Sequence, residues 1–181
     1  MKSEDQFTTT FSKLGGWKSD LQLDKKVTLI VEALEKSSPW LEPLDLKESE
    51  NEIITHHLKG EMVDQSWLKL ARLRFQAKQL GLSRLTFIDA LSKEPHSSAL
   101  VNGLAAVVQR AGSAANTQQV SALFHQAGDL GSPFAWVNLA LIDLKAGRLE
   151  KGRDYLKKAL ALGAFKDNET LKSEVKELTG P

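Results

Sequence analysis

A pattern of large and small residues recurs three times in this 181-residue chain, starting near residue 64. Trp67, Val101 and Trp136 stand 34 and 35 residues apart, and each is followed at the third and fourth positions by a leucine and an alanine. Gly112 and Gly147 each follow an anchor by 11 residues, where a turn between two helices would fall. Self-similarity with a period of about 20–50 residues is typical of folds in which one small unit stacks on the next.

Each unit has the features of two antiparallel helices. Prolines are scarce and fall at the apparent breaks, and no stretch alternates polar and β-branched residues as a strand would. Small residues allow paired helices to approach closely, and large residues fill the space between one pair and the next. The small positions are Ala71, Ser83, Ala105, Ala140 and Gly152, and the large ones are Trp67, Phe87 and Trp136. One pair cannot bury its apolar face alone, so neighbouring pairs must stack.

These spacings resemble the tetratricopeptide repeat (TPR), with a Sel1-like ending in the second and third units. The third unit carries the resemblance most fully, through Trp136, Leu139, Ala140, Gly147, Gly152, Tyr155 and Ala159. The departures are Ser83, where the family usually has alanine, and an enlarged turn in the second unit. The resemblance implies an all-α fold, an α-solenoid of about three TPR-like helical hairpins. The three repeats would cover 64–97, 98–132 and 133–165, together residues 64–165.

The sequence before the repeats predicts an N-terminal helical extension over residues 21–63. A first helix is expected over 24–37, with Asp24 as its N-cap and one apolar stripe. Pro39 and Pro43 predict an extended or turn-like segment as far as Leu46. A second helix is expected over about 47–62, and the two helices would form a hairpin that caps the first repeat.

The two ends of the chain differ. Residues 166–181 predict a capping helix that starts at Asp167 or Asn168 and turns Leu171, Val175 and Leu178 inward. Residues 1–20 have weak periodicity, so they are interpreted either as a mobile segment or as one that docks on the rest of the chain.

The resemblance also implies that the first helix of each hairpin lines a groove, which binds a peptide or a helix of a partner protein. The inward-facing positions are Leu68, Arg72, Phe75, Gln76, Asn102, Ala106, Gln109, Arg110, Phe134, Val137, Leu141, Leu144 and Lys145. Such a groove is apolar with some basic residues, and it suits a segment that carries one or two acids. The function predicted on this basis is a non-catalytic protein–protein interaction module, an adaptor or small chaperone.

An alternative is that these apolar faces are covered permanently. The cover would be the protein itself, residues 1–20 or a second copy. Residues 134–146 are apolar nearly all round, so that helix must be buried on most sides. A homodimer would achieve this, and the chain would then be a structural subunit of a larger assembly.

Charge is unevenly placed along the chain. Residues 42–64 hold seven acids and two lysines, whereas residues 65–88 hold five bases and no acid. Pairing between these two segments is the simplest account, and an acidic protein partner is the next. A nucleic-acid-associated factor is a weaker alternative, because the net charge of the whole chain is only +1.

Little in the sequence indicates catalysis, and we expect no enzyme, no cofactor and no metal site. Cysteine is absent, which excludes disulfides and thiolate chemistry. His56 and His57 each have a glutamate four residues away, but these pairs lie on different facets of a helix and are interpreted as solvated residues. No apolar run approaches the length of a membrane span and no signal peptide is visible, so the expected location is cytoplasmic.

Overall fold

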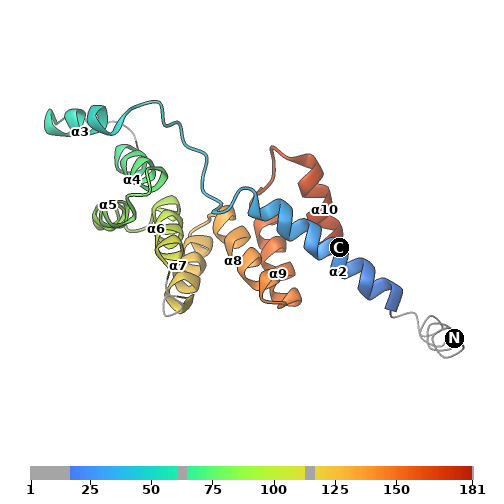
Figure 1. Ribbon diagram of the computed structural model, residues 1–181. Coiled ribbons are helices and arrows are strands. Elements are labelled where there is room, and N and C mark those ends of the chain that lie inside the picture. The colour runs from blue at the N-terminus through green and yellow to red at the C-terminus, as the bar shows by residue number, and fades with distance from the viewer. Residues whose placement is uncertain (1–16, 61–64, 113–116, 181) are drawn as a thin grey trace, which may run out of the picture.

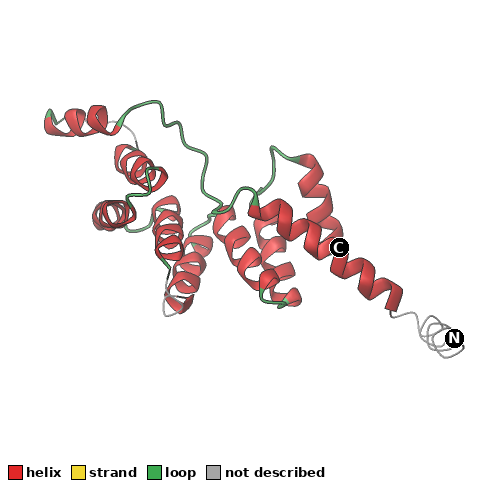
Figure 2. Cartoon of the chain, in the orientation of Figure 1, coloured by secondary structure: helices red, strands yellow, loops and turns green. Residues whose placement is uncertain are grey.

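The computed structural model describes residues 17–60, 65–112 and 117–180. In these ranges the chain forms helices joined by loops and turns, with no strand (Figure 2). The all-α fold class is therefore confirmed. The helices are α2 (Trp17–Glu35), α3 (Glu50–Leu58), α4 (Ser66–Gln76), α5 (Leu80–Lys93), α6 (Ser98–Ala111), α7 (Thr117–Asp129), α8 (Pro133–Lys145), α9 (Leu149–Ala161) and α10 (Glu169–Thr179).

The helix that precedes the repeats begins earlier than predicted. α2 includes Asp24, so this residue lies inside the helix and does not cap it. Of the segment 1–20, residues 17–20 are the first residues of α2, and residues 1–16 lie outside the described part of the chain. The expectation that this segment is mobile or docks therefore stays untested for those residues.

Helix α3 is shorter than the predicted range of 47–62, because a capping box fixes its start. The Ser49 hydroxyl accepts a hydrogen bond from the Glu52 N–H, and the Glu52 carboxylate accepts one from the Ser49 N–H at 2.7 Å. Side chains of Ser97, Ser132 and Asn168 cap α6, α8 and α10 in a similar way.

Within each of the three predicted repeat ranges, two helices pack against each other. The pairs are α4 with α5, α6 with α7, and α8 with α9. Contacts of α5 with α6 and of α7 with α8 join the pairs into a row (Figure 1). Each helix pair therefore packs on the next pair along the sequence.

Close approach within the pairs occurs at the small residues. The Ser83 hydroxyl of α5 donates to the carbonyl oxygen of Ala71 in α4 at 2.8 Å, and both residues are buried. In the third pair, a Cβ added at Gly152 would lie 2.5 Å from Cδ2 of Leu144. A serine can therefore stand in place of the usual alanine, because its hydroxyl bonds to a carbonyl oxygen of the paired helix. At residue 152 a glycine fits because the Leu144 side chain fills the space that a Cβ would need.

Large aromatic residues fill the space between successive pairs. Phe87 of α5 lies so near α6 that a Cβ added at Gly103 would be 2.4 Å from its ring. Trp136 of α8 lies equally near α7, since a Cβ at Gly128 would be 2.4 Å from its Cε2 atom. Both rings are buried, as the packing interpretation of the repeat predicted.

The C-terminal helix covers the end of the row, as predicted. The side-chain oxygen of Asn168 accepts a hydrogen bond from the Leu171 N–H at 3.0 Å and so caps α10. Leu171, Val175 and Leu178 are buried, and α10 packs on α9.

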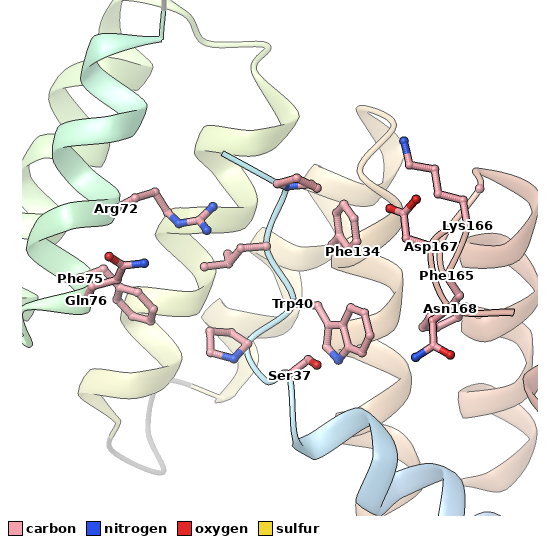
Figure 3. Close-up of a pocket in the computed structure, with 14 residues that line it drawn as sticks. Ser37, Trp40, Arg72, Phe75, Gln76, Phe134, Phe165, Lys166, Asp167 and Asn168 are labelled. Atoms are coloured by element: carbon pink, nitrogen blue, oxygen red, sulfur yellow. The ribbon is translucent and has the colours of Figure 1, made fainter. Parts of the chain in front are cut away.

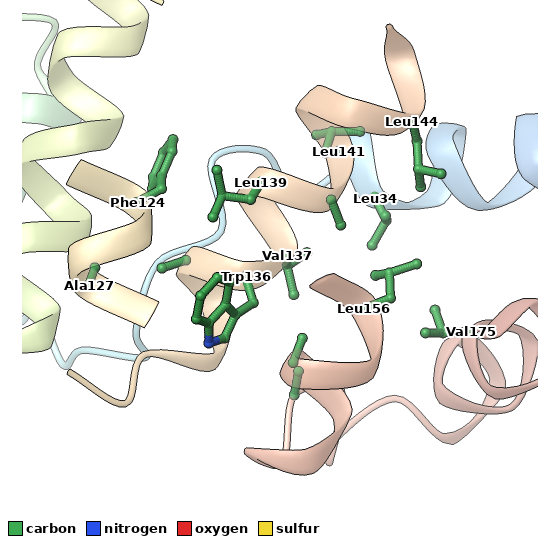
Figure 4. Close-up of a cluster of buried hydrophobic side chains, with 14 of the residues drawn as sticks. Leu34, Phe124, Ala127, Trp136, Val137, Leu139, Leu141, Leu144, Leu156 and Val175 are labelled. Atoms are coloured by element: carbon green, nitrogen blue, oxygen red, sulfur yellow. The ribbon is translucent and has the colours of Figure 1, made fainter. Parts of the chain in front are cut away.

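The predicted hairpin of the two N-terminal helices is wrong. α2 packs on α8 and α10, whereas α3 contacts α4 at the opposite end of the row (Figure 1). The apolar stripe of α2 packs on α8 and not on α3. Ile30 and Leu34 are fully buried there, in one cluster with Val137 and Leu141 (Figure 4).

A second copy of the chain was one of the covers considered for helix α8. The helix is instead enclosed within one chain by α2, α7 and α9. Of its apolar residues, Pro133, Phe134 and Ile142 are partly exposed and the others are buried. The apolar character of α8 therefore gives no argument for a homodimer.

Candidate functional site

The segment between α2 and α3, residues 36–49, has no helix or strand and runs across the face formed by α4, α6 and α8. We call this segment the strap and this face the inner face. The prediction that this segment is extended or turn-like, without a helix, is confirmed. The strap lies where the repeat pattern predicts a groove for a partner protein.

Two buried asparagines hold the main chain of the strap. The side-chain oxygen of Asn138 accepts a hydrogen bond from the Trp40 N–H at 2.9 Å, and its amide nitrogen donates to the Trp40 carbonyl oxygen at 2.8 Å. Asn102 donates to the same carbonyl oxygen at 3.1 Å, and its own oxygen accepts a bond from Asn138 at 3.2 Å. The two asparagines thus hold both the N–H and the carbonyl oxygen of one strap residue.

The side chain of Glu42 is held two residues further along the strap. One carboxylate oxygen accepts a hydrogen bond from the Ser132 hydroxyl at 2.5 Å, and the other accepts one from Asn102 at 3.1 Å. Ser132 is also the N-cap of α8, so the same side chain starts a helix and holds the strap. On α4, Arg72 donates to the carbonyl oxygen of Glu42 at 3.0 Å.

The Trp40 ring fixes the strap between the helices. It stacks on Phe134 with 6.3 Å between ring centroids and meets the edge of Phe165 at 5.3 Å. Its indole N–H donates to the carbonyl oxygen of Leu34 at the end of α2. Leu41 and Leu44 pack against the core of the first two helix pairs.

The acidic and basic segments of the sequence meet at the far end of the strap. Lys69 pairs with Glu48 at 2.7 Å, and Arg74 pairs with Glu50 at 2.8 Å. The prediction that these segments pair within the chain is confirmed. The Lys69 ammonium donates a hydrogen bond that lowers the pKa of Glu48 below its ordinary value.

A pocket of about 500 Å³ remains open around the strap (Figure 3). Arg72, Phe75 and Gln76 of α4 lie on one side of the strap, and Phe134, Phe165 and Asn168 lie on the other. The remaining lining residues are Ser37, Pro39, Trp40, Leu41, Pro43, Gly163, Lys166 and Asp167. Four aromatic residues and two prolines thus contribute to the wall, beside charged and polar side chains.

Arg72 is the most unusual polar group of this pocket. Its Nε atom is buried and makes no hydrogen bond within the described structure. Burial lowers the pKa of the guanidinium, and the nearby Glu42 carboxylate opposes that change. A buried donor without an acceptor is costly, so a ligand that brings a carboxylate or carbonyl oxygen to Arg72 would gain from it.

The structure divides the predicted groove residues into three groups. Seven are buried in the core or beneath the strap and α2: Leu68, Phe75, Asn102, Ala106, Val137, Leu141 and Leu144. Arg72 and Phe134 are half-buried, and Gln76 is exposed, and these three line the pocket together with Phe75. Gln109, Arg110 and Lys145 are exposed at the ends of their helices, where Arg110 lies over the Phe75 ring and Lys145 pairs with Glu35.

Sequence reasoning missed four residues that build this site: Trp40, Glu42, Ser132 and Asn138. Asn138 offered a signal, since it is the only amide in the apolar run 134–142. A buried amide needs a partner, and its position two residues after Trp136 places it near the start of α8.

The histidine pair on α3 has structural partners. The His57 ring lies 4.3 Å from the Trp67 ring, and its Nε2 atom is 3.2 Å from the Ser66 hydroxyl. His57 therefore helps to hold α3 on α4. Among the residues that the structure describes, no group of three or more potential ligand side chains gathers as a metal site.

Within the described ranges, none of the helices combines the length and the hydropathy needed to cross a membrane. Comparison with protein-family models, curated proteins and solved structures found no match to this chain. The functional argument therefore starts from the inner face and its pocket.

Proposed function

We propose that the chain is a non-catalytic protein-interaction module that binds an apolar, acid-bearing segment of a partner protein in the pocket beside the strap. The carrying observation is the half-buried Arg72, whose buried Nε atom makes no hydrogen bond in the described structure, in a pocket with four aromatic side chains. Apolar pockets with a few convergent polar groups are the usual form of binding sites. Lys166 at the rim adds a second positive charge.

The proposal includes the architecture. The three helix pairs are assigned as TPR-like hairpins of a short solenoid, with α10 as the cap. Support comes from the contacts of Ser83 with Ala71 and of Gly152 with Leu144, which are the close approaches that the repeat pattern predicts. In this assignment the first helices of the hairpins, α4, α6 and α8, form the inner face.

The test is selection of peptides from a random display library on the full chain. Enriched peptides should combine aromatic or aliphatic residues with an acid. Their affinity, measured by fluorescence anisotropy, should fall about tenfold with Phe134→Ala, which removes a wall of the pocket, and about threefold with Lys166→Glu. Lys25→Glu, at an exposed position of α2, is the matched control and should leave the affinity unchanged. Peptides without that pattern, or binding that ignores both pocket variants, would contradict the proposal.

A second candidate function is a structural subunit, and an exposed apolar stripe on α5 favours it. Leu82, Leu85 and Ile88 are 49%, 64% and 46% exposed, at helical spacing. Contiguous exposed apolar residues often mark a contact with another protein. Light scattering at two protein concentrations tests this candidate: a mass near 20 kDa at both would argue against self-association, and a larger mass that Leu85→Lys reduces would support it.

A further inference from the structure

We propose that strap residues 39–44 occupy the inner face as an intramolecular ligand, and that an extended segment of a partner protein with the same pattern takes their place. The pattern is an aromatic residue followed, two residues later, by glutamate, with proline and leucine nearby. This inference rests on the proposed function, and it names the partner chemistry and the event that opens the face.

The first argument is the kind of bond that holds the strap. Asn138 and Asn102 bind the N–H and carbonyl oxygen of Trp40, not its side chain. Such bonds are available to any extended chain that enters the inner face with the same direction. Both asparagines are buried beneath the strap, at 2% and 0% exposed, so an empty face would exchange their bonds to the strap for bonds to water. Nothing in these bonds demands that the occupant belong to the same chain.

The second argument concerns the acid. The donors to the Glu42 carboxylate are a hydroxyl, from Ser132, and an amide, from Asn102. Arg72 donates to the carbonyl oxygen of the same residue. A site built for hydrogen bonds discriminates strongly against an occupant that lacks the acceptor, because its buried donors are then unpaired. The glutamate position is thus the main source of specificity.

The third argument is the contrast in burial. Trp40, Leu41 and Leu44 of the strap are only half-buried, whereas Ile30 and Leu34 of α2 are fully buried. The strap is therefore less strongly held by the hydrophobic effect than the helix before it. α2 and α3 are anchored independently, on α8 and α4, so the strap can leave the face while both helices stay in place.

A tethered ligand competes at an effective concentration of about millimolar, so the intact chain should bind a partner weakly. The apparent affinity of the chain for a partner is the intrinsic affinity multiplied by the fraction of molecules whose inner face is open. Weakening the strap by a factor of ten should therefore raise the affinity for a free peptide by up to about tenfold.

The experiment uses a fluorescent peptide with the sequence of residues 37–46, SSPWLEPLDL. Its binding to the full chain is compared with binding to the Glu42→Ala chain by anisotropy. We expect about tenfold tighter binding to the variant, and loss of binding when the glutamate of the peptide is replaced by alanine. The matched control is Asp45→Ala, an exposed acid of the same strap that pairs with Lys47, and it should behave as the unchanged chain.

Circular dichroism shows whether Glu42→Ala remains helical, and Glu42→Gln, which keeps one acceptor oxygen, is the milder second variant with the same expected direction. Equal binding to all chains, or no binding to either Glu42 variant, overturns the inference. If selected peptides bind at the pocket but the strap peptide never exchanges, this inference falls and the proposed function stands. If a Glu42 variant forms a dimer that the peptide disperses, the occupant is a second copy, and the assignment to a partner protein is overturned.

Discussion

The two ends of the helix row are closed in different ways. At the C-terminal end, α2 covers α8 and α10 with fully buried aliphatic residues such as Ile30 and Leu34. At the N-terminal end, the strap and α3 meet α4 through ion pairs, and α5 leaves leucines exposed. The comparison teaches that one continuous N-terminal segment closes the neutral part of the row by hydrophobic burial and the charged part by polar contacts. The first closure is strong and non-directional, and the second is weaker but specific.

Leu34→Ala should cause the largest loss in this comparison, because it removes a fully buried side chain from the contact of α2 with α8. The free energy of unfolding should fall by about 2–5 kcal/mol, measured by urea denaturation followed by circular dichroism. Leu29→Ala on the same helix is the control, since Leu29 is 61% exposed and should change stability by less than about 0.5 kcal/mol. Similar losses for the two variants would mean that α2 is not packed as described.

Gly128→Ala should come next, and it examines how tightly α7 and α8 pack. The new Cβ would lie 2.4 Å from Cε2 of Trp136, so the ring or the helix must shift, at a cost of about 1–3 kcal/mol. Gly81→Ala on α5 meets no atom within 4 Å and should leave stability unchanged or raise it by up to about 1 kcal/mol. Thermal unfolding of both variants gives the comparison, and a stabilised Gly128→Ala would refute the close contact.

Asn138→Ala should have a comparable effect on stability, but one confined to the strap. The change removes the two hydrogen bonds that Asn138 makes to the Trp40 main chain. The free energy of unfolding should fall by about 1–3 kcal/mol. Hydrogen–deuterium exchange should show faster exchange of the Trp40 amide while the amides of α9 keep their protection. Gln126→Ala, an exposed residue of α7, is the control. If the Trp40 amide kept its protection in Asn138→Ala, the asparagine would not be what holds the strap.

Glu48→Gln should have the smallest effect and should depend on pH. Because the hydrogen bond from Lys69 lowers the pKa of Glu48 in the folded chain, the pair stabilises the fold above the unfolded pKa. That stabilisation is lost as the pH falls through the folded pKa. Between about pH 5 and pH 3, the unchanged chain should therefore lose more stability than Glu48→Gln.

The expected difference for Glu48→Gln is small, since the pair lies near the surface, and high salt should reduce it further. Denaturation curves at several pH values measure this difference, with Glu174→Gln, at an exposed position of α10, as the control. A Glu48→Gln chain that lost stability over that pH range as steeply as the unchanged chain would show that the pair contributes nothing.

Much of the fold could be predicted from local signals. The helical period, the prolines of the strap and the capping helix are properties of short stretches, and the structure confirms them. The position of α2 could not be predicted in this way. Its apolar stripe indicates that a partner surface exists, but α8 lies more than 100 residues later in the chain. Choosing among such surfaces depends on tertiary packing, which spacing does not encode.

The site shows the same limit more sharply. Asn102 was placed on the inner face because the repeat pattern positions it there, and the structure brings it to the strap. Asn138 was not placed there, because the residues around an isolated amide in an apolar helix do not indicate which group it will bind. Glu42 belonged to an acidic run that pairs elsewhere with bases, yet its own carboxylate binds a hydroxyl and an amide. The repeat pattern predicts which helices form the inner face, and only the structure shows that the strap lies on it.

The long reach of the strap also bears on how the chain folds as it is made. Trp40 and Asn138 are 98 residues apart, so the strap leaves the ribosome well before its binding face exists. At about 5–20 residues per second, synthesis of the intervening chain takes on the order of 10 seconds. During that interval the apolar stripe of α2 has no partner, and the nascent protein presents Ile30 and Leu34 to the surrounding solution. The contact of α2 with α8 can therefore form only after α8 has been made, long after α2 itself.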